Sequence, residues 1–353
     1  MPLTIALLMG YLSVLSLLDE KIAPRFKLRI FWINAALFAS IAGLRSGDGM
    51  PDYAMYEHLY FEAIDSTGFG LVEPSFKLIS LLADFLVSRE PWVMFFIYAL
   101  VGVLLKNWLI LRFSIPLFLG QLIYLSNYYI IHELIQIRTG VATCFIVLSI
   151  IHMARNDKKT GAILICIATF FHYSSFVFLA LMFVNFRRFK EKYFALGLVV
   201  SYGLYYFNMD PITLGLNFFS EYFFFVKSAY LNLERAEGLA INVVGFFALT
   251  KIFVVLFFLV CSHNRSAAID PFLSMGLITF FIGVCCYITL ARFPEIAVRI
   301  SYTLMFFEVL VIPFIAKMFT PSYMAVTIVI MFCWASFLAN VFLTHYFSHT
   351  LLV

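Results

Sequence analysis

Apolar residues occupy this chain in long runs that short polar segments separate. A helix needs ~20 mostly apolar residues to cross the hydrocarbon core of a bilayer. Runs that reach or approach this length cover residues 3–18, 28–45, 91–111, 114–131, 138–154, 193–207, 239–262, 271–290, 296–318 and 322–345. The pattern predicts an all-α fold, a polytopic membrane helical bundle of roughly ten to twelve membrane helices. We expect residues 1–353 to form a single integral membrane domain.

Lysine and arginine residues gather in basic clusters, which the positive-inside rule places in the cytoplasm. These clusters are Lys21/Arg25/Lys27/Arg29, Lys106/Arg112, Arg155/Lys158/Lys159 and Arg187/Arg188/Lys190/Lys192. All of them can lie on one side only if two apolar segments, 73–88 and 160–185, do not cross the membrane. This threading places both termini and most of the other charged residues at the outer face.

The two segments that do not cross have distinct patterns. Residues 73–88 carry a polar stripe at helical spacing, which predicts an amphipathic or re-entrant helix at the outer face. Its polar residues are Lys77, Ser80, Asp84 and Ser88. Residues 160–185 are interrupted at His172 and predict a re-entrant hairpin from the cytoplasm, with His172 at its tip. Non-helical backbone at that depth must be buried or line a wet cavity. In the longest outer segment, 208–238, residues 218–225 are expected to lie on the membrane surface.

Composition agrees with this path. The chain of 353 residues is 63% hydrophobic and 12% charged, and its mean hydropathy is +0.97. A soluble domain carries about 25% charged residues, so the shortage of charge indicates that apolar side chains face lipid. The net charge of +4 is too small to suggest nucleic acid as a partner.

Several kinds of site are missing from the sequence. All six cysteines lie in apolar runs and none has metal-site spacing. No P-loop, GxSxG, HExxH or Asp-rich motif occurs. We therefore expect chemistry that needs no metal, no cofactor and no cytoplasmic ATP.

An island of charge and flexible backbone lies at 43–62, just beyond an apolar run. Arg45, Asp48 and Asp52 fall in a turn that Gly47, Gly49 and Pro51 shape. An ordinary solvated loop is one interpretation. The other is a carboxylate base beside an arginine that clamps an anion, since the guanidinium group stays charged and binds phosphate bidentately.

A second group of polar residues lies at 292–302. Arg292, Glu295, Arg299 and Tyr302 share one helical stripe, and Pro294 indicates that a helix begins there. Arg299 lies about one turn inside the membrane segment, where a charge is costly and usually functional. The alternative is a structural ion pair of Glu295 with Arg299 or Arg292.

Two further residues are candidates. Arg138 lies between two apolar runs and is followed by the small residues Gly140 and Ala142. It is either an interfacial anchor or a further anion clamp. His172 is either a hydrogen-bonded core residue or a group that contacts substrate.

These segments, taken in order, resemble a known family. The motifs are GLRSGDGMPDYAMY, EPSF, IRTGVATCFIVLSI, ATFFHYSSFVFL and AVRISYTLMFFEVLVIP. They run along nearly the whole chain, and their order and spacing resemble the EpsG-type polysaccharide polymerases, relatives of the Wzy O-antigen polymerases. The family pattern falls on Arg45, Asp52, Tyr53, Tyr56, Glu73, Pro74, Arg138, Gly140, Ala142, His172, Arg299 and Tyr302. The family's Gly-Thr-Asp-Tyr turn is Met50-Pro51-Asp52-Tyr53 here, so the resemblance gives no role to Asp48.

The resemblance implies an enzyme that joins oligosaccharide repeat units carried on undecaprenyl diphosphate, in the synthesis of O-antigen, capsule or exopolysaccharide. It would work at the periplasmic face of the bacterial cytoplasmic membrane, with membrane lipid and a chain-length regulator protein as partners. Asp52 is the first choice of general base, followed by Asp48 and Glu295. The predicted clamp for diphosphate and sugar consists of Arg45, Arg138, Arg292 and Arg299, with Tyr53, Tyr56 and Tyr302, and His172 would orient substrate.

Two other functions stay open. An O-antigen ligase has related chemistry but favours a larger outer loop. A lipid-linked oligosaccharide transporter or flippase would need no new bond, and it predicts charges within several spans and repeat symmetry. Most of the arginines discussed here gather at one face, which favours the polymerase.

Overall fold

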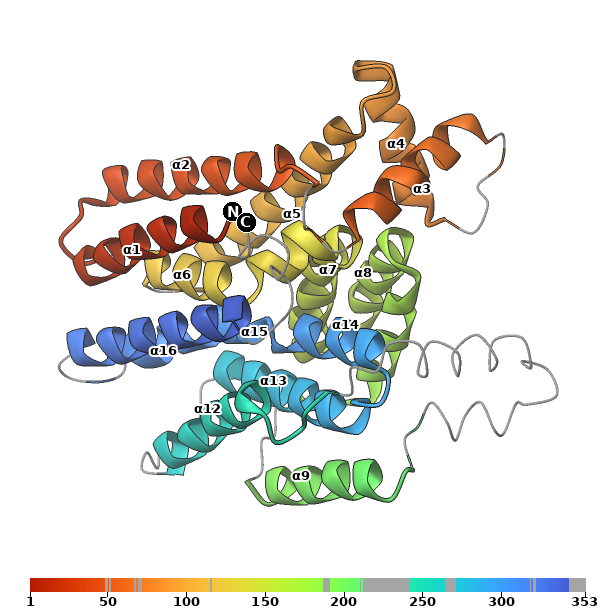
Figure 1. Ribbon diagram of the computed structural model, residues 1–353. Helices are drawn as coiled ribbons and strands as arrows, with labels where there is room; N and C mark the ends of the chain where they lie inside the picture. The colour runs from red at the N-terminus through yellow and green to blue at the C-terminus, as the bar shows by residue number, and fades with distance from the viewer. Residues whose placement is uncertain are drawn as a thin grey trace. The chain divides into compact units, whose positions relative to one another are not determined.

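The computed structural model describes residues 1–47, 50, 52–66, 68, 72–114, 116–186, 191–209, 211, 241–263, 271–317, 319 and 322–342. All regular secondary structure in these residues is helical, as Figure 1 shows, and they contain no strand. The predicted all-α fold is therefore confirmed for the described part of the chain.

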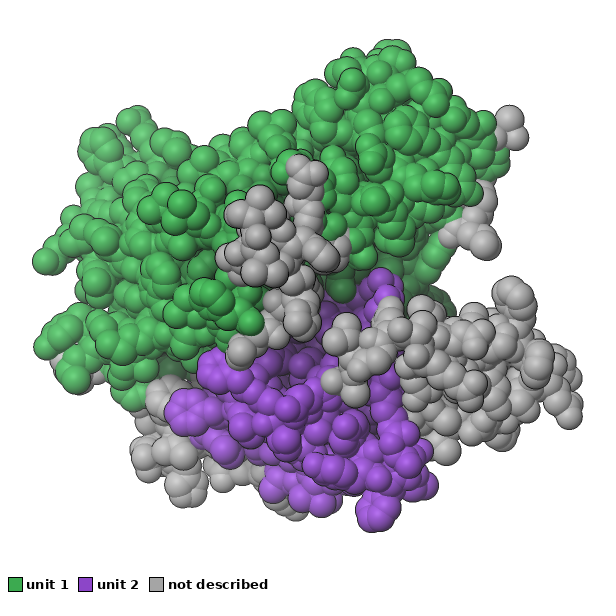
Figure 2. Space-filling view, viewed as in Figure 1, with its two compact units in different colours: residues 1–184, 308–353 green, residues 185–307 purple. Residues whose placement is uncertain are grey.

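The described residues divide into two compact units, shown in green and purple in Figure 2. Unit 1 consists of Met1–Val184 and Glu308–Val353, and unit 2 consists of Asn185–Phe307. The elements of unit 1 are α1 (Pro2–Leu18), α2 (Pro24–Gly43), α3 (Tyr53–Asp65), α4 (Pro74–Leu86), α5 (Pro91–Phe113), α6 (Leu117–Asn127), the π-helical η1 (Ile130–Ile135), α7 (Ile137–Ala154), α8 (Lys158–Phe171), the 3₁₀-helical η2 (Tyr173–Phe183) and α16 (Ser322–Phe342). Unit 2 contains α9 (Glu191–Tyr206), α12 (Phe246–His263), α13 (Pro271–Thr289) and α14 (Pro294–Met305), and α15 (Phe307–Lys317) begins at its last residue.

Six described helices are long and apolar enough to cross a membrane, which supports a multi-pass membrane protein. They cover Pro24–Gly43, Pro91–Phe113, Ile137–Ala154, Pro271–Thr289, Pro294–Ala316 and Ser322–Phe342. Shorter apolar helices lie at Pro2–Leu18, Tyr173–Phe183, Tyr193–Tyr206 and Phe246–Leu256. The larger number of ten to twelve membrane helices, and the single membrane domain, stay predictions.

The run at 114–131 forms a shorter helix than its hydropathy suggested. Helix α6 has 11 residues, a length of about 16 Å, which is too short to cross a core of ~30 Å alone. It is rich in polar contacts: Gln121 donates to Asn107 Oδ1 (2.8 Å) and accepts from Asn34 (3.0 Å). The chain then continues as the π-helical η1, a geometry that is rare and often found at functional sites.

One residue of the predicted cytoplasmic clusters lies in the interior instead. Lys106 is fully buried in α5, where its Nζ lies 2.5 Å from Glu133 Oε1 and donates to the carbonyl of Gly140 at 2.7 Å. The carboxylate of Glu133 compensates the buried charge, so Lys106 does not mark a loop. The assignment of Lys106 to a basic cytoplasmic cluster was wrong.

The segment 73–88 contains α4, and the first half of its polar stripe faces inward, whereas Asp84 is half-buried and Ser88 is exposed. Lys77 and Ser80 are buried, whereas Leu82 and Phe85 are exposed. The ammonium group of Lys77 donates to the carbonyl of Ala63 and to that of Ser66 (2.7 Å), at the end of α3. It thereby satisfies carbonyls that the helix end leaves without partners and ties α3 to α4. An outward apolar face suits contact with lipid.

The segment 160–185 forms two helices that pack against each other, α8 and η2. His172 lies at the turn between them with extended backbone. The predicted hairpin with His172 at its turn is present in the described chain. Its re-entrant position in a membrane stays a prediction. The segment 218–225 lies outside the described residues.

Candidate active site

An aromatic cluster in unit 1 joins α3, which carries two of the predicted site residues, to α4 and α5. Tyr53 and Tyr56 come from α3, Phe76 from α4 and Phe95 from α5, and α3 and α4 lie side by side in Figure 1. Tyr53 stacks on Phe95 with ring centroids 4.4 Å apart, and Tyr56 meets Phe95 at 6.2 Å and Phe76 at 6.1 Å. These four aromatic residues, from three different helices, thus form one continuous cluster of rings.

Arg45 lies two residues beyond the end of α2, against one side of this cluster. Its guanidinium carbon is 4.6 Å from the centroid of Phe95 and 5.7 Å from that of Tyr53. The side chain is only 5% exposed, and Nη1 donates to the carbonyl of Ala42 at 2.5 Å. Its Nε and Nη2 are buried and find no acceptor among the described residues. Gly47 permits this arrangement, because a Cβ there would overlap the ring of Tyr53.

The unsatisfied nitrogens of Arg45 favour an anion. A desolvated cation–π contact contributes about 2 kcal/mol, whereas each buried donor without an acceptor costs about 1–3 kcal/mol, and more when it is charged. Burial lowers the pKa of Arg45 to about 10, so the group still carries its charge at neutral pH. A bound anion would accept hydrogen bonds from these nitrogens and raise the pKa of Arg45 towards its ordinary value.

Arg138 lies in the first turn of α7, against two other rings of the same cluster. Its guanidinium carbon is 5.1 Å from the centroid of Tyr56 and 5.6 Å from that of Phe76. Nη1 forms an ion pair with Oε2 of Glu73, the residue that precedes α4. Arg45 and Arg138 therefore flank one aromatic cluster, and part of the charge of Arg138 is already balanced.

Glu73 also holds His172. Its Oε1 lies 3.0 Å from Nδ1 of His172, and both side chains are buried. Burial by itself raises the pKa of Glu73, but the hydrogen bond with His172 and the charge of Arg138 outweigh it and leave the pKa below its ordinary value of 4.5. Glu73 is thus ionised at neutral pH. It fixes an arginine from α7 and a histidine from the α8–η2 turn with one carboxylate.

A buried ion pair between Lys106 and Glu133 stabilises the start of α7. Lys106 bridges Glu133 of η1 and the carbonyl of Gly140, and Tyr124 donates to Glu133 Oε1 at 2.9 Å. Gly140 is needed here because a Cβ would overlap the carbonyl oxygen of His132. The small residue Gly140 therefore allows the start of α7 to pack closely against the backbone of η1.

The predicted carboxylates of the first island are only partly described. Asp52 precedes α3 with φ 64° and does not cap the helix with its side chain. A left-handed backbone is uncommon outside glycine, although aspartate tolerates it better than most residues. Asp48 lies outside the described residues.

The remaining predicted residues lie in unit 2. Pro294 begins α14, as its position predicted. Glu295 and Arg299 form an exposed ion pair with Oε2 and Nη2 3.2 Å apart, which is the structural alternative considered for them. Arg292 is half-buried, and Tyr302 stacks on Phe247 with centroids 5.0 Å apart.

The structure thus brings together Arg45, Tyr53, Tyr56, Arg138 and His172 in unit 1, and a separate set in unit 2. The convergence of the two sets stays a prediction. Sequence reasoning named Glu73 only within the family pattern and gave it no role. The signal was a carboxylate directly before Pro74 at the start of an amphipathic helix.

No group of three or more His, Cys, Asp or Glu side chains that could hold a metal ion occurs in the searched, described part of the chain. Independence of metals stays a prediction.

Comparison with known proteins gives one result. The EpsG family model matches residues 28–352, nearly the whole chain. No match was found among curated proteins or among solved structures.

Proposed function

Because this chain belongs to the EpsG family, we propose that it is a membrane glycosyltransferase that polymerises oligosaccharide repeat units carried on undecaprenyl diphosphate. The polymerisation takes place at the periplasmic face of the bacterial cytoplasmic membrane. In each cycle the growing glycan leaves its lipid diphosphate and joins a hydroxyl at the non-reducing end of a new unit.

The observation that carries this proposal is the buried guanidinium of Arg45. Two of its nitrogens find no acceptor in the described residues, and its guanidinium group makes cation–π contacts with the rings of Phe95 and Tyr53. This suits an anion with several oxygens, such as a diphosphate, since charged donors in a desolvated site bind strongly. Arg138 is the second clamp residue, weakened by its pair with Glu73.

The reaction needs four parts. The acceptor oxygen forms a bond to the anomeric carbon of the donor glycan, and the bond from that carbon to the phosphate oxygen breaks. The hydroxyl proton passes to a base, for which Asp52 is the first choice, with Asp48 and Glu295 behind it. The leaving diphosphate keeps the electron pair and is stabilised by Arg45 and Arg138.

Glu73 is a positioning residue in this scheme rather than the base. A general base works best with a pKa near the operating pH, and the pKa of Glu73 is lowered. Its carboxylate holds Arg138 against Tyr56 and orients the ring of His172. His172 then orients substrate, while Tyr53 and Tyr56 offer ring surfaces and hydroxyl groups to sugar.

Purified full-length protein in lipid vesicles, supplied with synthetic undecaprenyl-diphosphate-linked repeat units, tests the proposal. We expect a ladder of polymers and released undecaprenyl diphosphate. Translocation of intact units without new bonds would indicate a transporter, and transfer only onto a lipid A core would indicate a ligase. Asp52→Asn at equal expression tests the base, because an unchanged polymer yield would exclude that role.

A further inference from the structure

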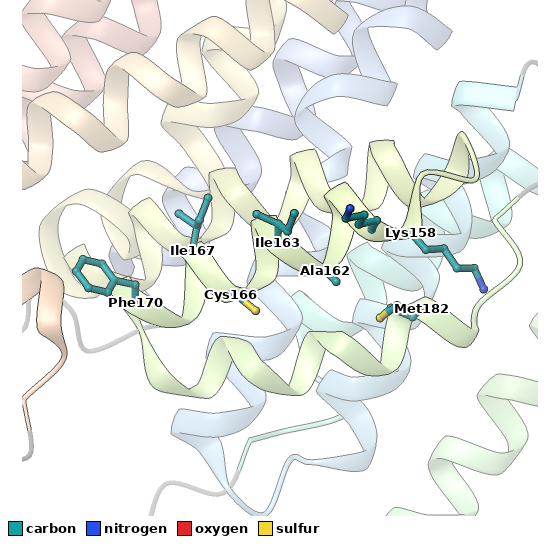
Figure 3. A pocket seen from close by; sticks show the side chains of 8 residues that line it. Lys158, Ala162, Ile163, Cys166, Ile167, Phe170 and Met182 are labelled. Carbon is teal, nitrogen blue, oxygen red and sulfur yellow. The ribbon is translucent and has the colours of Figure 1, made fainter.

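A groove of ≈730 Å³ lies along α8, away from the residues described above. It is lined by Lys158 and Lys159 at the start of α8 and by six other residues. Figure 3 shows its labelled side chains in order along α8 from Lys158 to Phe170, with Met182 of η2 near the lysine end. The other lining residues are Ala162, Ile163, Cys166, Ile167, Phe170 and Met182.

The groove has the chemistry of an amphiphile with a negative head. The side chains that line it from Ala162 to Phe170 are apolar, and its only charged lining residues, Lys158 and Lys159, are at one end. Both lysines are exposed, and neither forms an ion pair with a described residue. The neighbouring Asp157 is already engaged, since it accepts from the Thr160 backbone at 3.1 Å and lies 3.0 Å from Nδ1 of His152.

The dimensions of the hairpin match one leaflet of a bilayer. Helix α8 has 14 residues and η2 has 11, so at rises of ~1.5 and ~2.0 Å per residue each arm is about 21 Å long. Half of a bilayer with its headgroups is ~20–22 Å thick. Met182, near the end of η2, lines the groove together with Lys158, so the arms run antiparallel.

We propose that this groove binds one anionic phospholipid of the cytoplasmic leaflet, with its phosphate at Lys158 and Lys159 and an acyl chain along Ile163, Cys166 and Ile167. The lysines belong to a cluster that the positive-inside rule places in the cytoplasm. Basic pockets on that side of membrane proteins bind acidic headgroups. A polyprenyl diphosphate held by Arg45 and Arg138 would instead have its charge near His172, at the opposite end of α8.

The site goes beyond the proposed polymerase activity and has a structural consequence. The lipid would join the two arms of the hairpin whose turn carries His172, and His172 contacts Glu73. Occupancy would therefore stabilise the α8–η2 hairpin and, through His172, the contacts of Glu73.

The test uses purified full-length protein in non-ionic detergent, titrated with dioleoylphosphatidylglycerol or dioleoylphosphatidylcholine and measured by native mass spectrometry. We expect retention of one phosphatidylglycerol by the wild type. Each lysine near an anionic headgroup contributes roughly a fivefold gain in affinity, so Lys158→Gln/Lys159→Gln should raise the half-saturating concentration by about twenty-five-fold. Arg25→Gln/Arg29→Gln removes the same charge from exposed residues elsewhere and should change nothing.

A second readout locates the lipid in the groove. Cys166 is exposed in the groove, whereas Cys144 and Cys333 are buried, so its alkylation by a maleimide should slow when phosphatidylglycerol binds. Ala162→Trp, which fills the groove, should abolish retention without removing a charge. Three results would overturn the proposal. The wild type could retain phosphatidylcholine as well as phosphatidylglycerol, or the double lysine variant could bind phosphatidylglycerol as tightly as the wild type. The third result is that undecaprenyl phosphate displaces the lipid equally in the wild type and in the double lysine variant.

Discussion

Arg138 and Glu73, which are 65 residues apart in sequence, form a largely buried ion pair that joins the first turn of α7 to the start of α4. Because of this pair, the two arginines at the aromatic cluster differ in how far their charge is compensated. Arg138 is held in place and partly neutralised by Glu73, whereas Arg45 keeps two nitrogens without acceptors in the described residues. We therefore expect Arg45 to make the stronger contact with the anion.

Arg45→Gln should abolish most of the polymerase activity. Removing one preorganised donor from a site that stabilises a leaving group lowers the rate by roughly 10²–10³-fold, and Arg45 offers two such donors. The rate of polymer formation in vesicles, at equal protein content, measures the effect.

Arg89→Gln is the matched control for that substitution. Arg89 also lies over a ring, that of Phe61, but it is exposed and pairs with Asp65 at 3.1 Å. An exposed pair contributes ~0–1 kcal/mol, so we expect activity near that of the wild type. Equal losses in Arg45→Gln and Arg89→Gln would refute a specific role for Arg45.

Glu73→Gln should lower activity through Arg138 and His172 rather than by removing a base. We expect a fall of about tenfold to a hundredfold in the maximal rate, and the variant should keep the wild-type dependence of rate on pH near neutrality. Initial rates between about pH 6 and pH 9 measure this. Loss of the acidic limb of the rate profile in Glu73→Gln would show that Glu73 is itself the base.

The lowered pKa of Glu73 also predicts how stability depends on pH. A carboxyl group whose pKa is lower in the folded protein than its ordinary value of 4.5 stabilises the fold above that value. This contribution is lost as the pH falls below 4.5 through the folded pKa. Thermal unfolding of purified protein at about pH 7 and about pH 3 should show a stability gap between wild type and Glu73→Gln at the higher pH that closes at the lower. A gap of the same size at both would contradict the ion pair.

Lys106→Met should destabilise unit 1. It leaves the buried carboxylate of Glu133 without its cation, and breaking a buried pair in this way costs about 3–5 kcal/mol. Lys106→Met/Glu133→Leu removes both charges and should recover part of that loss. Unfolding midpoints of the two variants in one detergent compare them, and a double variant less stable than Lys106→Met would contradict the pairing.

The sequence predicted those features that depend on local pattern. The apolar runs predicted the six described helices that are long and apolar enough to cross a membrane, Pro294 predicted the start of α14, and the break at His172 predicted the turn between α8 and η2. Glu73 received no role because its partners Arg138 and His172 lie 65 and 99 residues away and meet it only through packing. Lys106 was misplaced for the same reason, since only the fold reveals that Glu133 compensates its charge.

A cryo-electron microscopy map of the full-length protein with undecaprenyl diphosphate bound will show whether Arg45 binds the diphosphate of the lipid-linked substrate. We expect phosphate oxygens about 2.7–2.9 Å from Nε and Nη2 of Arg45, with Arg138 still over the rings of Tyr56 and Phe76. A diphosphate bound elsewhere, with the two nitrogens of Arg45 as they are in the unbound protein, would contradict this expectation.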